Sequence, residues 1–529
     1  MDNYQAFDDK NILLVCAESF SWPMHYVAER LRNDCASLSA IFIQPGEAYF
    51  EGDDYKAFKS LNNDILIHEM SSVVSQYLNL HKQAEENIDW KYINKIESLY
   101  TKYSSINEQL IAEMTLLPCY HDRGYYEYID YNRILLYVQI YYQYMERLIE
   151  DNGFDIILDC GDDFFGRGVL LEIASKNKVP YISIDQARFN SYVLPSTSLK
   201  RVREPQIEEA FNNFSKDKGI SFDENILAAY QKIMKSMESI QSEYKESYSE
   251  SRFNAFKLIK RSLIRTLFFY KYFSFKKFKL NVFDGVSSPI CSNVLGSYKF
   301  TYLGYFRRFY LEYGNVFEKA DLTKINYIFI PLQVIPESST SVLSPYYINE
   351  YFIIESLSKS IRPDQFVVVK EHWNMIGYRN VSFYKQIKRL PNVILIDPTI
   401  YPSPTDYIRN SDLVVTTSGS SGLEASFMGV NSLIMSDVIY GLLSCNKKIS
   451  ITPDLRKVVA KHIKYKMPVQ ELYAYIKLLL EYGAICNIDN LQNQPSINKK
   501  INVDEDVTSL LTVFANGLEL YNNKQNKDL

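Results

Sequence analysis

The stretch that decides the fold is DLVVTTSGSSGLEASFMGV, residues 412–430. An apolar run, LVV, leads through small and hydroxylated residues into a segment with helical spacing that begins at Gly422. A strand joined to a helix by a Ser/Gly turn is a building unit of parallel α/β sheets, and the turn lies at the carboxyl end of the strand. The segment therefore predicts a doubly wound α/β domain around it.

The same alternation of strands and helices continues on both sides of this segment. We expect strands at 327–331, 365–370, 393–396, 412–417 and 431–435, and helices at 345–360, 382–389, 405–410 and 422–429. Such an alternation forms a parallel sheet that helices cover on both faces. Residues 321–490 are thus predicted to be one domain, followed by a partly helical tail at 491–529.

A second alternation of this kind occupies the N-terminal part of the chain. Strands are expected at 11–17, 39–43, 64–68, 154–159 and 180–185, and a mostly helical stretch at 72–151. Residues 1–200 are therefore predicted to be an α/β domain with a helical insertion, and 201–320 a helical linking region. Two such domains bind ligands in a cleft between the carboxyl ends of their strands.

Composition excludes several classes of protein. The 529 residues are 47% hydrophobic and 23% charged, which is the balance of a multidomain globular protein. The formal net charge of -5 argues against a nucleic-acid binder with a global positive field. No CxxC or HExxH pattern suggests zinc, and neither a basic leader nor a run of 18 apolar residues is present. We expect a cytoplasmic protein without metal or cofactor.

Residues 416–425 form a candidate anion-binding turn. Backbone amides at the start of a helix and the hydroxyls of Ser418, Ser420 and Ser421 can donate hydrogen bonds to a phosphate. The same residues also fit an ordinary helix start, with a serine cap and Glu424 in the first turn. The turn alone leaves both interpretations open.

Two further strand ends carry polar clusters. VVVKEHWNMIGYR, residues 367–379, ends a buried strand with ionisable side chains: Lys370, Glu371, His372 and Arg379. FIPLQVIPESS, residues 329–339, places Gln333 and Glu337 after another strand. Polar groups at these ends point toward the ligand cleft of a parallel sheet. The alternatives are a Lys–Glu pair on a solvated loop and a loop shaped by its two prolines.

Together these segments resemble the surface-carbohydrate and capsule polysaccharide biosynthesis family, whose best-known members are Kdo (3-deoxy-manno-octulosonic acid) transferases of bacterial capsules. The matching stretches are 331–347, 367–379, 392–398 and 412–430, with Tyr440 where the family has an aromatic residue. The N-terminal half matches only in layout. The resemblance implies a GT-B fold, two Rossmann-like domains with a nucleotide-sugar donor held mainly by the C-terminal one.

The resemblance also implies roles for individual residues. Lys370, Glu371 and His372 match the KEHP signature, and residues 419–424 match GTxGxEA, while Trp373 replaces the proline that would fix the backbone beside His372. Catalytic roles are implied for His372 and Glu371. Nucleotide-sugar binding is implied for Lys370, Arg379, Gln333, Glu337, Ser418, Gly419, Ser420, Ser421, Gly422, Glu424 and Tyr440.

The N-terminal domain is expected to handle the acceptor. In DCGDD, after the strand at 154–159, Asp162 or Asp163 is a candidate catalytic base. Arg188, after the next strand, is a candidate for binding an acidic sugar. Acids at strand ends also commonly cap helices.

The function that the resemblance implies is transfer of a ulosonic acid, such as Kdo or a nonulosonic acid. The donor would be CMP-activated, the acceptor a glycan or lipid-linked glycan, and no metal would be needed, because helix amides and side chains can stabilise the leaving phosphate. Two alternatives stay open. One is a UDP-sugar-dependent hexosyltransferase or an enzyme like UDP-N-acetylglucosamine 2-epimerase, and the other is a non-catalytic carbohydrate-binding or assembly protein.

Residues 252–279 form a basic aromatic segment. It holds nine Lys or Arg, nine Phe or Tyr and no acid. Such a composition suits an anionic membrane surface, so we expect peripheral association with the inner face of the cytoplasmic membrane. A helix packed on the protein is one alternative, and a platform for single-stranded nucleic acid is a less favoured one. We expect no nucleic-acid partner.

Overall fold

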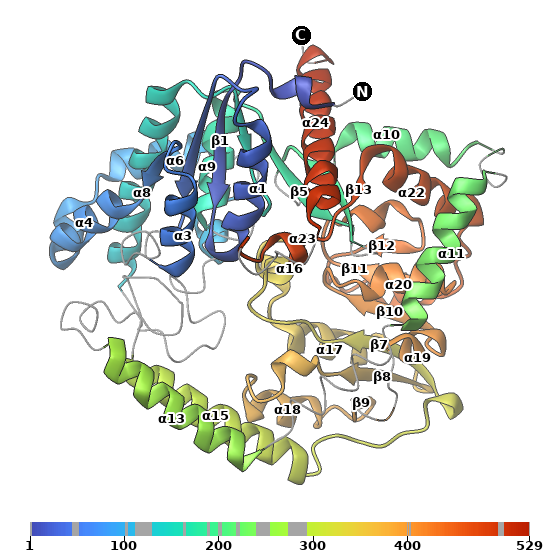
Figure 1. Cartoon of the computed structure of the whole chain (residues 1–529). Coiled ribbons are helices and arrows are strands. Elements are labelled where there is room, and N and C mark those ends of the chain that lie inside the picture. The colour runs from blue at the N-terminus through green and yellow to red at the C-terminus, as the bar shows by residue number, and fades with distance from the viewer. Residues whose placement is uncertain are drawn as a thin grey trace.

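The structure is a computed structural model, and it describes residues 3–44, 52–100, 104–111, 130–161, 165–187, 191–198, 204–217, 219, 223–239, 254–272, 294–398, 400, 404–495 and 502–527. Two α/β domains lie one above the other in Figure 1, and each is built on one sheet. Both sheets have the doubly wound order of strands, so the predicted GT-B arrangement is confirmed.

The first sheet has seven strands in the order β13-β6-β5-β4-β1-β2-β3. Their bounds are β1 Asn11–Cys16, β2 Ser37–Phe42, β3 Leu66–Glu69, β4 Ile156–Leu158, β5 Tyr181–Gln186, β6 Tyr192–Ser196 and β13 Ala484–Ile485. The strands β5, β4, β1, β2 and β3 are parallel, while β6 and β13 are antiparallel to their neighbours. The chain winds in opposite directions from β1, so the switch point of this sheet lies between β1 and β4.

Both faces of the first sheet are covered by helices. On one face Leu13 and Val15 of β1 pack with residues of α8 (Tyr131–Asn152) and α9 (Phe165–Lys176). On the other, Ile12 and Leu14 pack with α1 (Ser21–Leu31) and α24 (Asp504–Lys527). A strand buried on both faces needs apolar residues at every position, which explains the unbroken run in NILLVC. The other helices before β4 are α3 Asp53–Leu61, α4 Ser71–Leu80, α5 Ala84–Asn87, α6 Trp90–Tyr100 and α7 Ile106–Ile111.

The second sheet has six parallel strands in the order β12-β11-β10-β7-β8-β9. Their bounds are β7 Asn326–Pro331, β8 Gln365–Lys370, β9 Val393–Ile396, β10 Leu413–Thr416, β11 Ser432–Ile434 and β12 Asn446–Lys448. Its helices are α17 Glu350–Ser358, α18 Val381–Ile387, α19 Pro404–Arg409, α20 Ser421–Phe427, α21 Leu455–His462 and α22 Val469–Tyr482. The switch point lies between β7 and β10.

One predicted helix of this domain is wrong in its extent. The pattern predicted a helix at 345–360, but the structure has a 3₁₀ turn, Pro345–Tyr347, and then α17 from Glu350. Asn349 separates them because its backbone, at φ -78° and ψ 84°, lies outside the helical region.

The C-terminal segment returns to the first domain. Strand β13 pairs with β6, and after α23 (Ile488–Leu491) the long helix α24 packs Leu510 and Phe514 into the same core as Ile12. Figure 1 shows α24 standing beside the first sheet. The two ends of the chain therefore build one domain together.

The carboxyl ends of both sheets face the region between the domains. Beyond β1, Ser19 Oγ donates to Gln492 Oε1, 3.3 Å away, just after α23. In the second domain, α16 (Ser338–Ser341) follows β7. The hydroxyl of Tyr346 also donates to Glu108 Oε2 of the first domain at 3.2 Å. Both switch points thus open toward the boundary between the domains.

The described parts of the linking region are mostly helical. It contains α10 Pro205–Phe214, α11 Glu224–Ser239, α13 Ala255–Tyr272 and α15 Val294–Tyr313. Of the basic aromatic segment, residues 252–253 and 273–279 lie outside the described residues. In the described parts of the chain, no helix combines the length and apolar character that crossing a membrane requires.

Candidate functional site

The loops that follow β7 and β10 are tied together at the switch point of the second sheet. Gln333 Nε2 donates to Thr416 Oγ1 at 3.1 Å and to the carbonyl of Pro331 at 3.0 Å. The same Thr416 hydroxyl oxygen accepts a hydrogen bond from the backbone N–H of Gly419 at 3.1 Å. The predicted site residue Gln333 therefore holds the Ser/Gly turn in place from the neighbouring strand.

The Ser/Gly turn is not an ordinary capped helix start. Ser420 has helical backbone angles, φ -57° and ψ -21°, and its side chain makes no capping bond. Its hydroxyl donates to Glu424 Oε1 at 2.9 Å. Ser420, Ser421 and Glu424 are half-buried, whereas Ser418 is fully buried. Burial raises the pKa of Glu424.

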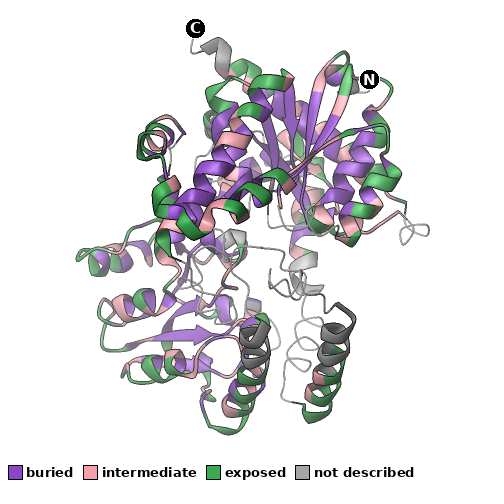
Figure 2. Ribbon diagram, turned by 90° about the vertical axis from the view of Figure 1, so that its left-hand side faces the viewer, coloured by how far each residue is buried: buried purple, intermediate pink, exposed green. Residues whose placement is uncertain are grey.

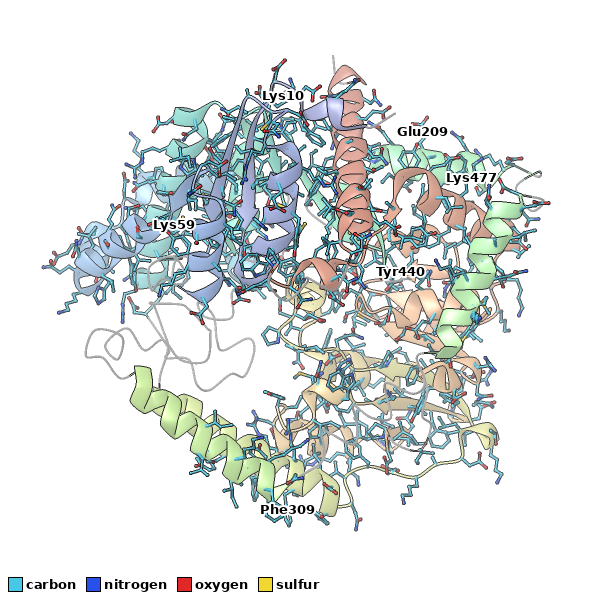
Figure 3. All side chains as sticks on the ribbon, viewed as in Figure 1. Lys10, Lys59, Glu209, Phe309, Tyr440 and Lys477 are labelled. Atoms are coloured by element: carbon cyan, nitrogen blue, oxygen red, sulfur yellow. The ribbon has the colours of Figure 1, made fainter. Side chains whose placement is uncertain are left out.

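Tyr440 lies beneath this turn. It is fully buried, and its hydroxyl donates to the carbonyl of Gly419 at 2.6 Å. Its ring lies so close to Gly422 that a β-carbon there would come within 2.8 Å of Tyr440 Cε2. Figure 3 labels Tyr440 inside the second domain. Tyr440, expected to bind the nucleotide sugar, thus supports the turn from below and has no exposed surface.

Tyr440 is itself held from behind by Asn446, which the sequence reasoning missed. Asn446 Nδ2 donates to the carbonyl of Tyr440 at 2.8 Å and to Ser426 Oγ at 2.8 Å. Asn446 opens the three-residue strand β12, which carries no pattern in the sequence. No local signal could have identified this contact.

Lys370 ends β8 in a buried position. The residue is 8% exposed, and its Nζ lies 5.5 Å from the centre of the Tyr407 ring. Burial lowers the pKa of Lys370 to about 8, although the nearby charges of Glu424 and Glu371 oppose the shift. The alternative of a Lys–Glu pair on a solvated loop is therefore wrong.

Glu371 is fully buried and engaged on both carboxylate oxygens. Its Oε2 accepts a hydrogen bond from the Tyr384 hydroxyl at 2.7 Å and lies 3.0 Å from Arg379 Nε. Its Oε1 accepts from the backbone N–H of His372 at 2.7 Å. Glu371, predicted to be catalytic, therefore positions His372 in this structure.

His372 is neutral and presents a donor. Its Nδ1 accepts a hydrogen bond from the backbone N–H of Asn374 at 3.2 Å, so the ring proton of the neutral form is on Nε2. Burial, reinforced by the positive charges of Lys370 and Arg379, lowers the pKa of His372 to about 4. Near neutral pH the residue can donate through Nε2 but carries no charge.

Trp373 keeps His372 in place where the family has proline. The two rings stack with centres 5.8 Å apart and planes 27° from parallel. The backbone of His372, at φ -77° and ψ 134°, has the extended ψ that a following proline would impose. The replacement therefore preserves the local backbone.

Arg379 lies between two buried carboxylates. Its Nη2 is 2.6 Å from Glu350 Oε2 and donates to the carbonyl of Gln333 at 2.5 Å, while Nε faces Glu371. Glu350 Oε1 in turn accepts from the backbone N–H of Gln333 at 2.7 Å. Burial raises the pKa of Glu350 to about 7, against the influence of Arg379. Arg379 thus joins the His372 loop to the Gln333 loop.

Glu350 is a second site residue that the sequence reasoning missed. It is the first residue of α17, and an acid in the first turn of a helix is so common that it gives no functional signal. Only the tertiary structure shows that its carboxylate faces Arg379.

The first sheet has its own buried ion pair at its switch point. Asp159, just after β4, lies 2.9 Å from Arg167 Nε and accepts from the Tyr181 hydroxyl at 2.5 Å. The Arg167 guanidinium lies 5.4 Å from the centre of the Phe20 ring. Asp159 and Arg167 are both buried, so the pair shapes this strand end.

The predicted residues thus fall into three groups. Around the switch point of the second sheet the structure gathers most of them: Gln333, Lys370, Glu371, His372, Arg379, Ser418, Gly419, Ser420, Ser421, Gly422, Glu424 and Tyr440. Glu337 is exposed beside α16. The acceptor candidates Asp162, Asp163 and Arg188 lie outside the described residues. No group of three or more His, Cys, Asp or Glu side chains in the described parts could hold a metal ion.

Comparisons with known proteins gave matches among solved structures alone, since no family model and no curated protein matches. The beta Kdo 2,7 transferase KpsC of Thermosulfurimonas dismutans is 14% identical, with a TM-score of 0.34, and the match covers 70% of this chain and 89% of that one. The beta Kdo 2,4 transferase KpsC of the same organism is 11% identical, with a TM-score of 0.31, and the match covers 64% of this chain and 84% of that one. UDP-GlcNAc 2-epimerase of Neisseria meningitidis, bound to UDP-GlcNAc, is 12% identical, with a TM-score of 0.24 and coverages of 88% and 93%.

The solved structures that this chain is similar to therefore include Kdo transferases, the group that the motifs resemble. Because the identities and TM-scores are low, the fold is assigned from the order of the strands in its own two sheets.

Proposed function

We propose that this protein is a glycosyltransferase of capsule or surface polysaccharide synthesis. It transfers a ulosonic acid, such as Kdo or a nonulosonic acid, from a CMP-activated donor to a glycan acceptor. The observation that carries the proposal is the gathering of Lys370, His372 and the 420–424 turn at the switch point of the second sheet. A switch point is where doubly wound sheets bind nucleotides.

The chemistry requires stabilisation of a leaving phosphate. The bond between the anomeric carbon and the phosphate oxygen breaks, and its electron pair stays on CMP. The acceptor oxygen forms the new bond and loses its proton to a base. The Lys370 ammonium and the Nε2–H of His372 would meet the developing negative charge, with little reorganisation because both side chains are held in place.

His372 would act as a hydrogen-bond donor in this scheme, because its low pKa leaves it uncharged near neutral pH. The carboxylate of Glu424, fixed by Ser420, would accept hydrogen bonds from the ribose hydroxyls. Since CMP carries a single phosphate, the Lys370 charge and these donors would suffice without a metal ion. This part of the proposal specifies a metal-independent enzyme.

The acceptor would bind on the first domain. Asp162 or Asp163 would take the proton of the acceptor hydroxyl, and Arg188 would bind an acidic sugar. The support is their place in the chain, just after β4 and β5 of the first sheet. A lipid-linked acceptor would bring the enzyme to the inner face of the cytoplasmic membrane.

The test is release of CMP from CMP-Kdo and from a CMP-nonulosonic acid, in the presence of a glycan acceptor. Lys370→Met and His372→Ala should each lower the rate about 100-fold or more, as expected for loss of one preorganised donor. Lys464→Met, at an exposed position after α21, is the matched control and should retain the full rate. Equal rates in all four proteins would refute the assignment of the donor site.

A further inference from the structure

We propose that α13 and α15 form a docking arm for an anionic membrane surface and that this arm is fixed to the loop following His372. The docking arm comprises the described residues 254–272 and 294–313. The two helices contact each other where the Tyr302 hydroxyl donates to Ser262 Oγ at 3.2 Å. Figure 1 shows both helices extending beyond the second domain.

The first helix of the arm carries an exposed apolar stripe. Phe256, Ile259 and Leu263 follow the three- and four-residue spacing that places side chains on one face of a helix. Phe256 is 84% exposed and Leu263 is 61% exposed. Ordinary packing on the protein would bury such a stripe, so the structure disfavours that alternative for α13.

The second helix carries a stripe that the sequence reasoning did not identify. Tyr302, Phe306, Phe309 and Tyr313 recur at intervals of four, three and four residues on α15. Phe306 is 63% exposed and Tyr313 is 62% exposed. Figure 3 labels Phe309 at the outer edge of the pair, and Figure 2 shows the described parts of the arm as largely exposed. The arm therefore presents aromatic rings from two helices.

The base of the arm is fixed to the site. Arg307 Nη1 donates to the carbonyl of Tyr378 at 2.5 Å, and its Nη2 bonds to Asn380 Oδ1. Arg308 Nε donates to the carbonyl of Ile376 at 3.0 Å. The close approach requires a glycine at 377, where φ is +89° and a β-carbon would meet the carbonyl of Gly304 at 2.7 Å. The loop of residues 376–380 contains Arg379, which is paired with Glu371 of the candidate site.

The positive charge of the docking arm favours an anionic partner. Residues 254–272 contain five Lys or Arg and no acid, and the side chains of Lys257 and Lys260 are exposed beside the apolar stripe. A second copy of the chain would bring like charges together if the two α13 helices packed on each other. Anionic headgroups would neutralise them, while the rings enter the interface. The surface thus fits an anionic lipid bilayer better than another copy.

Only the role of membrane docking in catalysis rests on the proposed function; membrane binding itself does not. Because α15 is fixed at the loop of His372, docking would hold the donor site at a set position relative to the membrane. A lipid-linked acceptor would then reach the site without the enzyme leaving the surface. Membrane binding itself needs no nucleotide and can be measured separately.

The experiment is sedimentation of the full-length protein with vesicles. We expect binding to vesicles of phosphatidylglycerol and phosphatidylcholine, weakening with added salt, and little binding to phosphatidylcholine alone. The variant Lys257→Ala/Lys260→Ala should bind roughly 30-fold more weakly, since each cation near an anionic surface contributes about fivefold. The variant Phe306→Ser/Phe309→Ser should also lose about tenfold or more.

Matched variants control for charge and for fold. Lys464→Ala/Lys466→Ala removes the same charge from exposed positions outside the arm, and Phe352→Ser removes an exposed ring from α17. Both should bind vesicles as the natural protein does, and all variants should melt at similar temperatures. Equal binding to both kinds of vesicle, or unchanged binding by both arm variants, would overturn the proposal. A dimer that Phe306→Ser/Phe309→Ser dissociates would overturn it in favour of a second copy.

Discussion

The contact between Gly422 and Tyr440 makes a sharp prediction about the turn that we assign to the donor. In Gly422→Ala, the new β-carbon would lie 2.8 Å from Tyr440 Cε2 and 3.2 Å from its hydroxyl oxygen. The ring cannot move aside easily, because Tyr440 is fully buried and bonded to Gly419 and Asn446. Overpacking of this kind costs about 1–3 kcal/mol, and alanine regains about 0.5–1 kcal/mol in a helix. The free energy of unfolding should fall by about 0.5–2 kcal/mol.

The same substitution should change sign when the ring is removed. In a Tyr440→Leu background both close ring atoms are gone and Ser432 Oγ, at 3.3 Å, is the nearest remaining atom, so Gly422→Ala should become neutral or stabilising by about 0.5 kcal/mol. Gly168→Ala in α9 is the matched control, since nothing lies within 4 Å of its added β-carbon. That variant should be stabilised by about 0.5–1 kcal/mol.

The measurement is denaturant unfolding of four proteins: the natural one, Gly422→Ala, Tyr440→Leu and the double variant. The free energy of unfolding should change while its dependence on denaturant concentration stays the same. The reasoning predicts a coupling between the two positions of about 1–2 kcal/mol. Additive effects of Gly422→Ala and Tyr440→Leu would refute the claim that the ring supports the turn by direct contact.

Three further predictions concern the buried charges. Because the pKa of Lys370 is about 8, its cationic fraction falls from ~90% at pH 7 to ~10% at pH 9. Calorimetry should therefore find that CMP binds about tenfold more weakly at pH 9 than at pH 7. In Lys370→Arg the affinity for CMP should be the same at both pH values. Because the pKa of Glu350 is raised to about 7, its carboxyl group stays protonated to a higher pH in the folded protein than in the unfolded chain. The stability that this difference contributes is present at low pH and is lost as the pH rises from about 5 to 7. Melting curves of Glu350→Gln should not show that loss. Arg167→Met leaves Asp159 buried without its partner and should lower the unfolding free energy by about 3–5 kcal/mol, most of which Asp159→Asn/Arg167→Met should restore in the same unfolding assay.

The sequence predicted most of the parallel strands because each is an apolar run between polar ends. Strand β8 has the predicted bounds, β7 begins one residue earlier than predicted, and β10 is one residue shorter than predicted at each end. Three strands were missed: β6 is YVLPS and contains a proline, β12 is NKK, and β13 has two residues. Their pairing depends on partners distant in the chain, as when β13 joins β6. A local pattern contains no information of that kind.

The sequence also predicted which residues lie at the candidate site, but not how they contact one another. The motifs identified the residues at the strand ends, including Lys370 and His372. They did not show that Glu371 and Arg379 are turned inward, because burial depends on the contacts of Glu350 and Tyr384. In the same way, the composition identified the basic aromatic segment at 252–279, but only the structure shows that the apolar stripe of α13 is uncovered.

The measurement that tests the central claim most directly is thermal unfolding of the purified protein with CMP, UDP, GDP or buffer. A nucleotide at 100 times its dissociation constant should stabilise the protein by about 2.7 kcal/mol. The account predicts an upward shift with CMP that Lys370→Met and Ser420→Ala abolish. Lys370→Met should melt at or above the temperature of the natural protein, since it removes a buried charge. A shift with UDP instead would contradict the CMP donor and favour a hexosyltransferase or epimerase, and a CMP shift that both variants retain would contradict the site itself.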